Sequence, residues 1–498
     1  MVRHGRLSKG CQTCRKRKIK CDQALPSCSQ CRKAGWVCPQ YEDSLDRMFQ
    51  YHHTEHKTEI KQPNLSLKSL QSSVATSAIT FELDRTRIGL SVPGCISPPL
   101  NDRAVEYFLI TNTFRNDDKL RGFYEYLPLF SDTKSGKEVS LSLTAAALAA
   151  YGNRFGYPEV LDRARHYYGR SLRSVNRALQ SPEDAATDDT MISILLLNTF
   201  EGLTSEGPTS LAYSEGHMKG ELMVLNLRGE SVMKTRHGLQ IFQHMSRCII
   251  TYCIIRPTRV PPDVIRLRRL AAKYMDTSDP AWKLEEMMIK LASFHTDVCE
   301  GVIADHKTII DVALKLDEEI CMLKASLSPM FEPKPTKSDE TMESQATSYM
   351  YSDLWAAYIW NYTRTCQLHL QNEVIIQLSQ QCGHSPSSSL ENQNLVAQSR
   401  MTMERLILDI CASVGQYGGH LLADSRDQYA TGHAPGPVPM VAGVYFLLLP
   451  LLIAGIMTPS DTQRDWIVQQ CRLLAKLTGI QRMATVADAI ANGDEPLL

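Results

Sequence analysis

Six cysteines lie within the first 38 residues of this 498-residue chain, and their spacing points to metal chemistry. A C-x2-C pair is followed by one more cysteine after six intervening residues, and the unit then repeats; the six are Cys11, Cys14, Cys21, Cys28, Cys31 and Cys38. A C-x2-C pair can place two thiolates on one tetrahedral zinc ion, at about 2.3 Å each. Two separate tetrahedral sites would need about eight thiolates, so six cysteines fit a pair of zinc ions that share two bridging sulfurs.

A run of positive charge lies between the second and third cysteines. It consists of Arg15, Lys16, Arg17, Lys18 and Lys20. Lysine and arginine neutralise backbone phosphates, and either can donate to the two acceptors on the major-groove edge of guanine. A metal-held backbone beside packed cations is typical of a protein that binds a nucleic acid such as double-stranded DNA.

Two other interpretations of the cysteines stay open at this point. A disulfide framework is typical of small secreted domains, but residues 1–30 contain no apolar segment of a secretory signal. A zinc module could instead bind another protein and serve as an adaptor without sequence-specific DNA binding. The basic run argues against the adaptor, since a purely structural zinc site has no need of five neighbouring cations.

The charge of the chain is divided unequally although its sum is zero. Lys and Arg together number 54, as do Asp and Glu. Residues 1–38 contain ten of the basic residues and a single acid, Asp22, so the rest of the chain carries an excess of acid. A cationic N-terminus on an acidic body indicates an anionic polymer as partner.

The N-terminal segment resembles the fungal zinc binuclear cluster, the six-cysteine DNA-binding domain of fungal transcription factors. The resemblance rests on all six cysteine positions, on the basic run with Ile19 and Asp22, and on the loop at residues 25–27. It implies two Zn²⁺ ions per chain, bridged by Cys11 and Cys28, and a short helix after Cys11 that enters the major groove.

The same resemblance implies roles for the basic residues. Lys18 falls where the family has its main base-contacting lysine, and Arg17 lies beside it. Arg15, Lys16 and Lys20 are expected to meet phosphates, which set affinity and register rather than sequence. CGG-like triplets are the expected target.

The rest of the chain divides into a linker and a large helical domain. We expect the zinc cluster at residues 11–38, a mostly disordered linker at residues 39–100, and an all-α domain at residues 101–498. Apolar residues recur at helical spacing in the large domain, and helix starts are expected at Pro158 and at Asp279-Pro280.

The large domain also resembles the helical regulatory domain that follows the zinc cluster in many fungal transcription factors. The similar segments occur in the family's order: Tyr151-Gly152-Asn153-Arg154, Leu195-Leu196-Leu197, His217-Met218-Lys219-Gly220, Leu225-Asn226-Leu227-Arg228-Gly229 and Pro450-Leu451-Leu452-Ile453-Ala454-Gly455.

No signature of an enzyme or a membrane anchor is found. The chain contains no glycine-rich phosphate loop, nucleophile elbow or paired-histidine zinc helix, and the glycine-rich residues 415–420 are interpreted as a helix end. The apolar segment at residues 441–457 is shorter than the about 20 residues that span a bilayer. We interpret it as a buried helix kinked at Pro450.

These observations and resemblances together predict a nuclear, non-enzymatic regulator of transcription by RNA polymerase II. By analogy with the family, we expect an activator of a metabolic or secondary-metabolite gene cluster, which contacts the transcription machinery. A homodimer is possible, but residues 44–60 offer barely one heptad where a coiled coil needs three or four. A dimer made by the large domain and a monomer both stay open.

Overall fold

The computed structural model describes two compact units, residues 1–100 (the head) and residues 101–498 (the body). The described residues are 13, 14, 17, 19–22, 24, 28–36, 38, 98–113, 123–131, 136–204, 215–336, 348–384, 390–431 and 441–493, without the side chains of 215, 217, 336, 382–384 and 418–431. Most of the expected linker, residues 39–97, lies outside them.

The described part of the head contains the short helix α2 (Ser29–Lys33), whose two ends are set by local sequence. Cys28 caps its N-terminus, where the Cys28 sulfur accepts a hydrogen bond from the Cys31 N–H. At its C-terminus the Gly35 N–H donates to the Arg32 carbonyl and the Trp36 N–H donates to the Cys31 carbonyl, which is the Schellman pattern. This pattern needs a positive φ at Gly35, observed at 64°, and glycine adopts it without steric cost.

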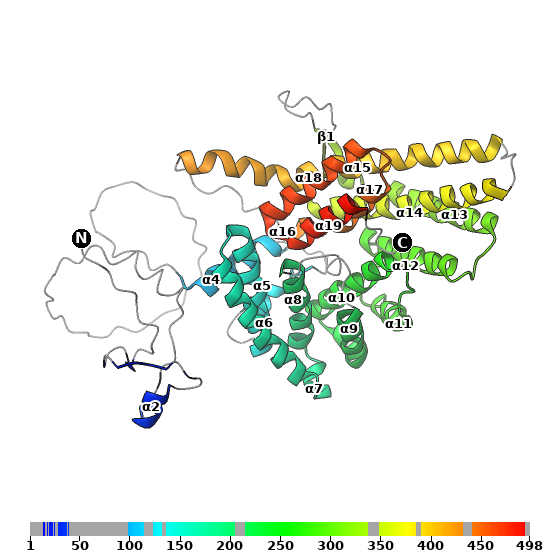
Figure 1. The fold of residues 1–498 in the computed structure, drawn as a ribbon. Coiled ribbons are helices and arrows are strands. Elements are labelled where there is room, and N and C mark those ends of the chain that lie inside the picture. The colour runs from blue at the N-terminus through cyan, green and yellow to red at the C-terminus, as the bar shows by residue number, and fades with distance from the viewer. Residues whose placement is uncertain are drawn as a thin grey trace, which may run out of the picture. The chain divides into compact units, whose positions relative to one another are not determined.

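The body is built almost wholly from α-helices, as the sequence predicts (Figure 1). In chain order they are α4 (Leu100–Asn112), α5 (Lys137–Phe155), α6 (Pro158–Ala178), α7 (Pro182–Ala185), α8 (Asp188–Thr204), α9 (Glu215–Arg228), α10 (Arg236–Ile255), α11 (Pro262–Ala271), α12 (Pro280–Cys299), α13 (His306–Ala325), α14 (Leu354–His384), α15 (Leu390–Thr431), α16 (Val441–Tyr445), α17 (Leu448–Met457), α18 (Asp461–Thr478) and α19 (Gln481–Asn492). Short 3₁₀ turns are η1 (Leu127–Phe130), η3 (Gly229–Lys234) and η4 (Pro329–Phe331).

The core of the body forms where helices that are apolar on every side meet helices that are apolar on one side. Helix α5 packs against α6 and α8, and both α5 and α8 bury residues around most of their circumference. Helix α14 packs against α13 and α15, and α17 lies against α14 and α19 (Figure 1). An all-round apolar helix is stable only inside a packed core, so α5, α8 and α17 are central.

A short hairpin is the one departure from helix among the described residues of the body. Strands β1 (Lys334–Thr336) and β2 (Ser348–Met350) pair antiparallel, with Pro335 opposite Tyr349. The expectation of an all-α domain did not include this hairpin. Three-residue strands are too short to show the alternating pattern by which a strand is recognised in a sequence.

Both expected helix starts are confirmed. Helix α6 begins with Pro158 in its first turn. Helix α12 begins after Asp279, whose carboxylate accepts hydrogen bonds from the N–H groups of Ala281 (2.8 Å) and Trp282 (3.4 Å), with Pro280 in the first turn. Proline fits the first turn because its missing N–H would have no partner there.

The apolar segment at residues 441–457 is buried, as expected, but it is interrupted earlier than the kink placed at Pro450. It forms α16 and α17 with a break at Phe446 and Leu447, and Pro450 falls in the first turn of α17. A proline deeper inside a helix would clash with the carbonyl four residues before it, so the helix restarts just ahead of the proline. Among the described residues, every helix falls short of the length and apolarity that crossing a membrane requires.

The interpretation of residues 415–420 as a helix end was wrong. Helix α15 runs through them to Thr431. At Gly415 a Cβ atom would lie 2.8 Å from the Ser348 hydroxyl oxygen, and β2 packs against α15. Glycine here therefore makes room for the hairpin instead of ending the helix.

Candidate metal centre and nucleic-acid interface

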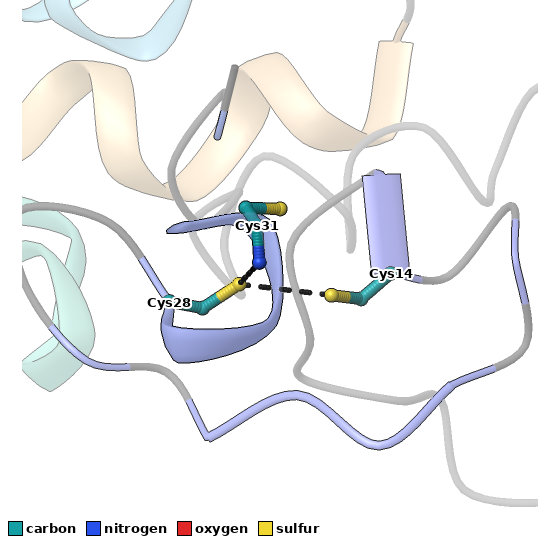
Figure 2. A group of neighbouring side chains, drawn as sticks. All are labelled: Cys14, Cys28 and Cys31. Atoms are coloured by element: carbon teal, nitrogen blue, oxygen red, sulfur yellow. Dashed lines mark hydrogen bonds between the residues drawn. The ribbon is translucent and has the colours of Figure 1, made fainter. Parts of the chain in front are cut away.

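The structure brings three of the six N-terminal cysteines together. The sulfurs of Cys14, Cys28 and Cys31 all lie within 4.8 Å of one another, and the three side chains are fully buried (Figure 2). The Cys14 and Cys28 sulfurs are 3.6 Å apart, although 14 positions separate these residues in the sequence. The two cysteine repeats thus fold against each other through their sulfurs.

The separation of these sulfurs fits a shared zinc ion better than a disulfide. A disulfide bond is about 2.05 Å long, whereas two thiolates on one tetrahedral zinc ion lie about 3.8 Å apart. The observed 3.6 Å between Cys14 and Cys28 is close to the second value. This separation takes away the support for the disulfide interpretation.

A second group of metal-binding atoms shares a member with the first. The side chains of Cys21, Asp22 and Cys28 offer ligand atoms within 4.8 Å of one another. Cys28 belongs to both groups, which suits a bridging sulfur. Cys38 is half-buried and packs against the same cluster, whereas Cys11, the other expected bridge, lies outside the described residues.

Asp22 also forms hydrogen bonds at the start of α2. Its carboxylate accepts hydrogen bonds from the Ser29 N–H, at 3.0 Å, and from the Ser29 hydroxyl. The hydroxyl bond of Ser29 is the main reason that the pKa of Asp22 lies below its ordinary value. An anion at the first N–H of α2 stabilises the helix start and so helps to hold Cys28 and Cys31 in place.

Each cysteine repeat contains an equivalent backbone hydrogen bond, so the two repeats are similar in local structure as well as in sequence. In the second repeat the Trp36 N–H donates to the Cys31 carbonyl at 2.9 Å, and in the first the Ile19 N–H donates to the Cys14 carbonyl at 3.1 Å. In both cases the donor lies five positions after the second cysteine of a C-x2-C pair. Gly35 precedes Trp36, and Lys18 occupies the corresponding sequence position in the first repeat.

The described cations of the head are exposed around this sulfur cluster. Arg17 and Lys20 are exposed, and so are Arg32 and Lys33 in the last turn of α2. The guanidinium carbon of Arg17 lies 3.8 Å from the centroid of the Trp36 ring, which is cation–π geometry. Three of the expected DNA-binding residues, Arg15, Lys16 and Lys18, lie outside the described residues.

Sequence reasoning missed Trp36 and the second role of Asp22. Trp36 is the only tryptophan in the first 38 residues, and an aromatic side chain near a basic run is a signal that could have found it. The contact between Asp22 and Ser29 spans seven positions across a loop, and no short motif encodes it.

Comparison with known protein families matches both units of the chain. Residues 9–48 match the family described as fungal Zn(2)-Cys(6) binuclear cluster domain, and residues 110–256 match the fungal specific transcription factor domain. Both resemblances drawn from the sequence are thereby confirmed. Both are families of transcription regulators rather than enzymes, and the cluster domain binds two zinc ions.

Individual relatives are similar only over short segments. The transcriptional regulatory protein moc3 of Schizosaccharomyces pombe is 34% identical over 81 residues, which are 16% of this chain and 15% of moc3. An uncharacterized transcriptional regulatory protein of the same organism is 41% identical over 51 residues, 10% of this chain and 9% of that protein. The match thus spans less than a sixth of either relative's length. No solved structure matches the chain.

Proposed function

We propose that this chain, which carries a fungal Zn(2)-Cys(6) binuclear cluster domain and a fungal-specific transcription factor domain, is a sequence-specific DNA-binding transcription factor. The observation that carries the proposal is the gathering of Cys14, Cys28 and Cys31, in a segment whose sequence has five cations directly after Cys14. The relatives described above are named transcriptional regulatory proteins, which supports the same conclusion.

The zinc ions would supply the fold that a short segment without an apolar core cannot build for itself. We propose that all six cysteines are their ligands and that Cys11 and Cys28 bridge them. The membership of Cys28 in both groups of ligand atoms supports its part of this assignment. The bound metals fix the backbone on which the basic residues are mounted.

The basic run would read DNA by two kinds of contact. Lys18 donates to the major-groove edge of guanine in a CGG-like triplet, with Arg17 beside it. Arg15, Lys16 and Lys20 meet phosphates and set the affinity. The cation–π contact of Arg17 with Trp36 supports a fixed position for the basic run, because it ties the run to the second cysteine repeat.

The wider role follows from the chemistry of a DNA reader. Such a protein acts in the nucleus, where we propose that it regulates transcription by RNA polymerase II through contacts with the transcription machinery. By analogy with the family, we propose an activator of a metabolic or secondary-metabolite gene cluster. One triplet specifies too few base pairs for a unique address, so a second triplet read by a second copy of the chain would add the missing information.

Selection of bound sequences from a random DNA pool tests the proposal with the zinc-loaded full chain. Lys18→Ala should cost about 1–3 kcal/mol of specific affinity and relax the preference at one base pair. Lys20→Ala should weaken binding to all sequences and lower the slope of log affinity against log salt by about one. Lys307→Ala, an exposed lysine of the body, is the matched control and should change neither quantity.

The adaptor interpretation makes the opposite forecast. A zinc module that binds only protein would select no sequence from the pool, and neither Lys18→Ala nor Lys20→Ala would alter a salt-dependent DNA affinity. That result would overturn the proposed function.

A further inference from the structure

A small cavity lies inside the body, away from the metal-binding cysteines. It has a volume of about 160 Å³ and is walled by α8, α10, α14, α17, α19 and the residues around Phe446. Aromatic side chains make up much of its wall, including Phe123, Tyr252, Tyr362 and Phe446. A cavity with such a lining suits a flat apolar group.

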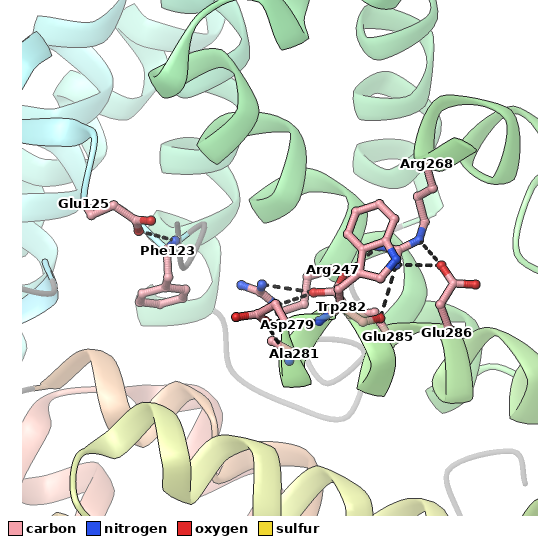
Figure 3. Close-up of polar contacts among 9 residues, drawn as sticks. All are labelled: Phe123, Glu125, Arg247, Arg268, Asp279, Ala281, Trp282, Glu285 and Glu286. Atoms are coloured by element: carbon pink, nitrogen blue, oxygen red, sulfur yellow. Dashed lines mark hydrogen bonds and ion pairs between the residues drawn. The ribbon is translucent and has the colours of Figure 1, made fainter. Parts of the chain in front are cut away.

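Two arginines line this cavity, and they differ in whether an acidic side chain pairs with them. Arg247 bonds Glu285 through Nε and Nη2, both at 3.0 Å (Figure 3). Burial alone would lower the pKa of Arg247, but Tyr358 and Glu285 raise it above the ordinary value. The charge of Arg247 is therefore already paired with the carboxylate of Glu285.

Arg482, at the start of α19, has no comparable partner among the described residues. Its side chain is partly buried, and its buried Nε–H donates to no acceptor there. Burial lowers the pKa of Arg482, which Tyr445 and Glu201 offset only in part. Glu201 accepts a hydrogen bond from the Tyr168 hydroxyl at 2.6 Å. An arginine in this setting gains most from an anion supplied from outside.

A second polar atom at the same cavity also lacks a partner. The Tyr445 hydroxyl is buried and without a hydrogen bond among the described residues. Gly202 of α8 lies beside Arg482, and a Cβ atom there would come 3.2 Å from the guanidinium carbon. The glycine thus leaves the guanidinium the room it occupies at the cavity wall.

We propose that this cavity binds a small carboxylate on a flat apolar body, with the carboxylate held by Arg482 and Tyr445 and the apolar body held by the aromatic wall. A buried donor without an acceptor costs free energy that a bound anion would recover. A cavity of about 150 Å³ in another protein holds benzene, so the volume here suits a ligand of benzoate size. The proposal goes beyond DNA recognition and stands or falls independently of it.

Isothermal titration of the zinc-loaded full chain with benzoate tests the proposal. We expect saturable binding with a Kd of about 1 mM or tighter, which is within reach of a ligand this small. Benzyl alcohol, neutral and nearly the same shape, should bind at least about tenfold more weakly because it cannot use the cation.

Two variants assign the binding to the cavity. Arg482→Gln should weaken benzoate binding at least about tenfold and leave benzyl alcohol binding within about twofold of wild type. Arg472→Gln is the matched control, because Arg472 is an exposed α18 residue paired with Asp488, and it should bind benzoate like wild type. Tyr445→Phe removes only the unpartnered hydroxyl, so the fold should survive, and benzoate affinity should fall about two- to tenfold.

Two outcomes would overturn the proposal. One is the absence of saturable benzoate binding to wild type at about tenfold above the expected Kd. The other is wild-type affinity in Tyr445→Phe, which keeps the proposal testable even if Arg482→Gln does not fold.

Discussion

The head and the body bury different kinds of side chain. Among the described residues of the head, the fully buried side chains are Cys14, Cys28 and Cys31, with Cys21, Trp36 and Cys38 packed around them. The body buries aliphatic and aromatic side chains from all of its long helices. The sulfurs of the head would be held together by zinc ions that a chelator can remove, whereas the core of the body is stabilised by the burial of apolar side chains. The two units should therefore lose their folds under different conditions.

The body contains a cluster of charged side chains that, unlike the exposed cations of the head, are buried and paired. Arg247 of α10 and Arg268 of α11 both bond Glu285 of α12, and all three residues are at most 5% exposed (Figure 3). Arg268 also bonds Glu286 and stacks on Trp282 at 4.0 Å. The described cations of the head are exposed to solvent, whereas these arginines of the body are buried and form ion pairs with buried glutamate.

Removing a zinc ligand should produce the largest difference between the two units. Cys31→Ser should lose bound zinc and abolish DNA binding, because the free energy of zinc binding, about 10–16 kcal/mol in zinc-finger peptides, is also the free energy of folding. Zinc content and DNA binding measure the effect in the head, and the far-ultraviolet circular dichroism of the body should stay unchanged. Cys299→Ser, at an exposed cysteine of the body, is the control. If chelation of zinc also melted the helices of the body, the comparison would fail.

Breaking the buried charge cluster should have the next largest effect, and only in the body. Glu285→Gln removes the anion between Arg247 and Arg268 and should cost about 3–5 kcal/mol in the free energy of unfolding. Glu286→Gln is the matched control, since Glu286 is 47% exposed, and should cost less than about 1 kcal/mol. Urea denaturation measures both values, with zinc content unchanged in each variant. Equal and small costs for the two variants would contradict a tightly coupled buried centre.

A buried carboxyl without a partner should make the body's stability depend on pH. Neither carboxylate oxygen of Glu221 has a hydrogen bond among the described residues, and burial raises its pKa well above the ordinary value. The folded body therefore keeps a proton that the unfolded chain releases above about pH 4.3. The contribution to stability is full below that pH and declines as the pH rises, by up to about 1.4 kcal/mol per pH unit.

Glu221→Gln removes this titration while keeping the shape of the side chain. The free energy of unfolding of the variant, relative to wild type, should rise steadily with pH above about pH 4.3 in urea denaturation. Glu318→Gln, at an exposed position of α13, should show no such trend. A flat difference for Glu221→Gln would mean that Glu221 is ionised in the folded body.

The sequence predicts the head well because its chemistry is local. The spacing of the cysteines and the run of cations lie within 38 residues, and metal geometry leaves few ways to use them. The contact of Arg17 with Trp36 was beyond such reasoning, since it joins the two repeats only after they fold against each other.

In the body, local signals predict where helices start but not what they meet. Asp279 and Pro280 mark the start of α12 in the sequence and in the structure. Gly415 suggests a helix end in the sequence, but a glycine is needed there because Ser348 approaches the helix closely. Ser348 belongs to a hairpin that has no sequence signal. Glu285 looks like any helical acid until α10 and α11 bring their arginines to it. Tertiary packing determines the roles of these residues, and the periodicity of the sequence does not predict tertiary packing.

The smallest expected effect lies in the head and separates its side-chain contacts from its metal chemistry. Trp36→Leu removes the ring beneath the Arg17 guanidinium, a contact that is modest at exposed sites. DNA affinity should fall about two- to fivefold, because Arg17 loses the surface that orients it. Trp36→Phe keeps an aromatic face and should recover most of the loss. Both variants should bind as much zinc as wild type, since sulfurs and not the ring hold the metal; a loss of zinc in Trp36→Leu would show that the head, like the body, depends on packing.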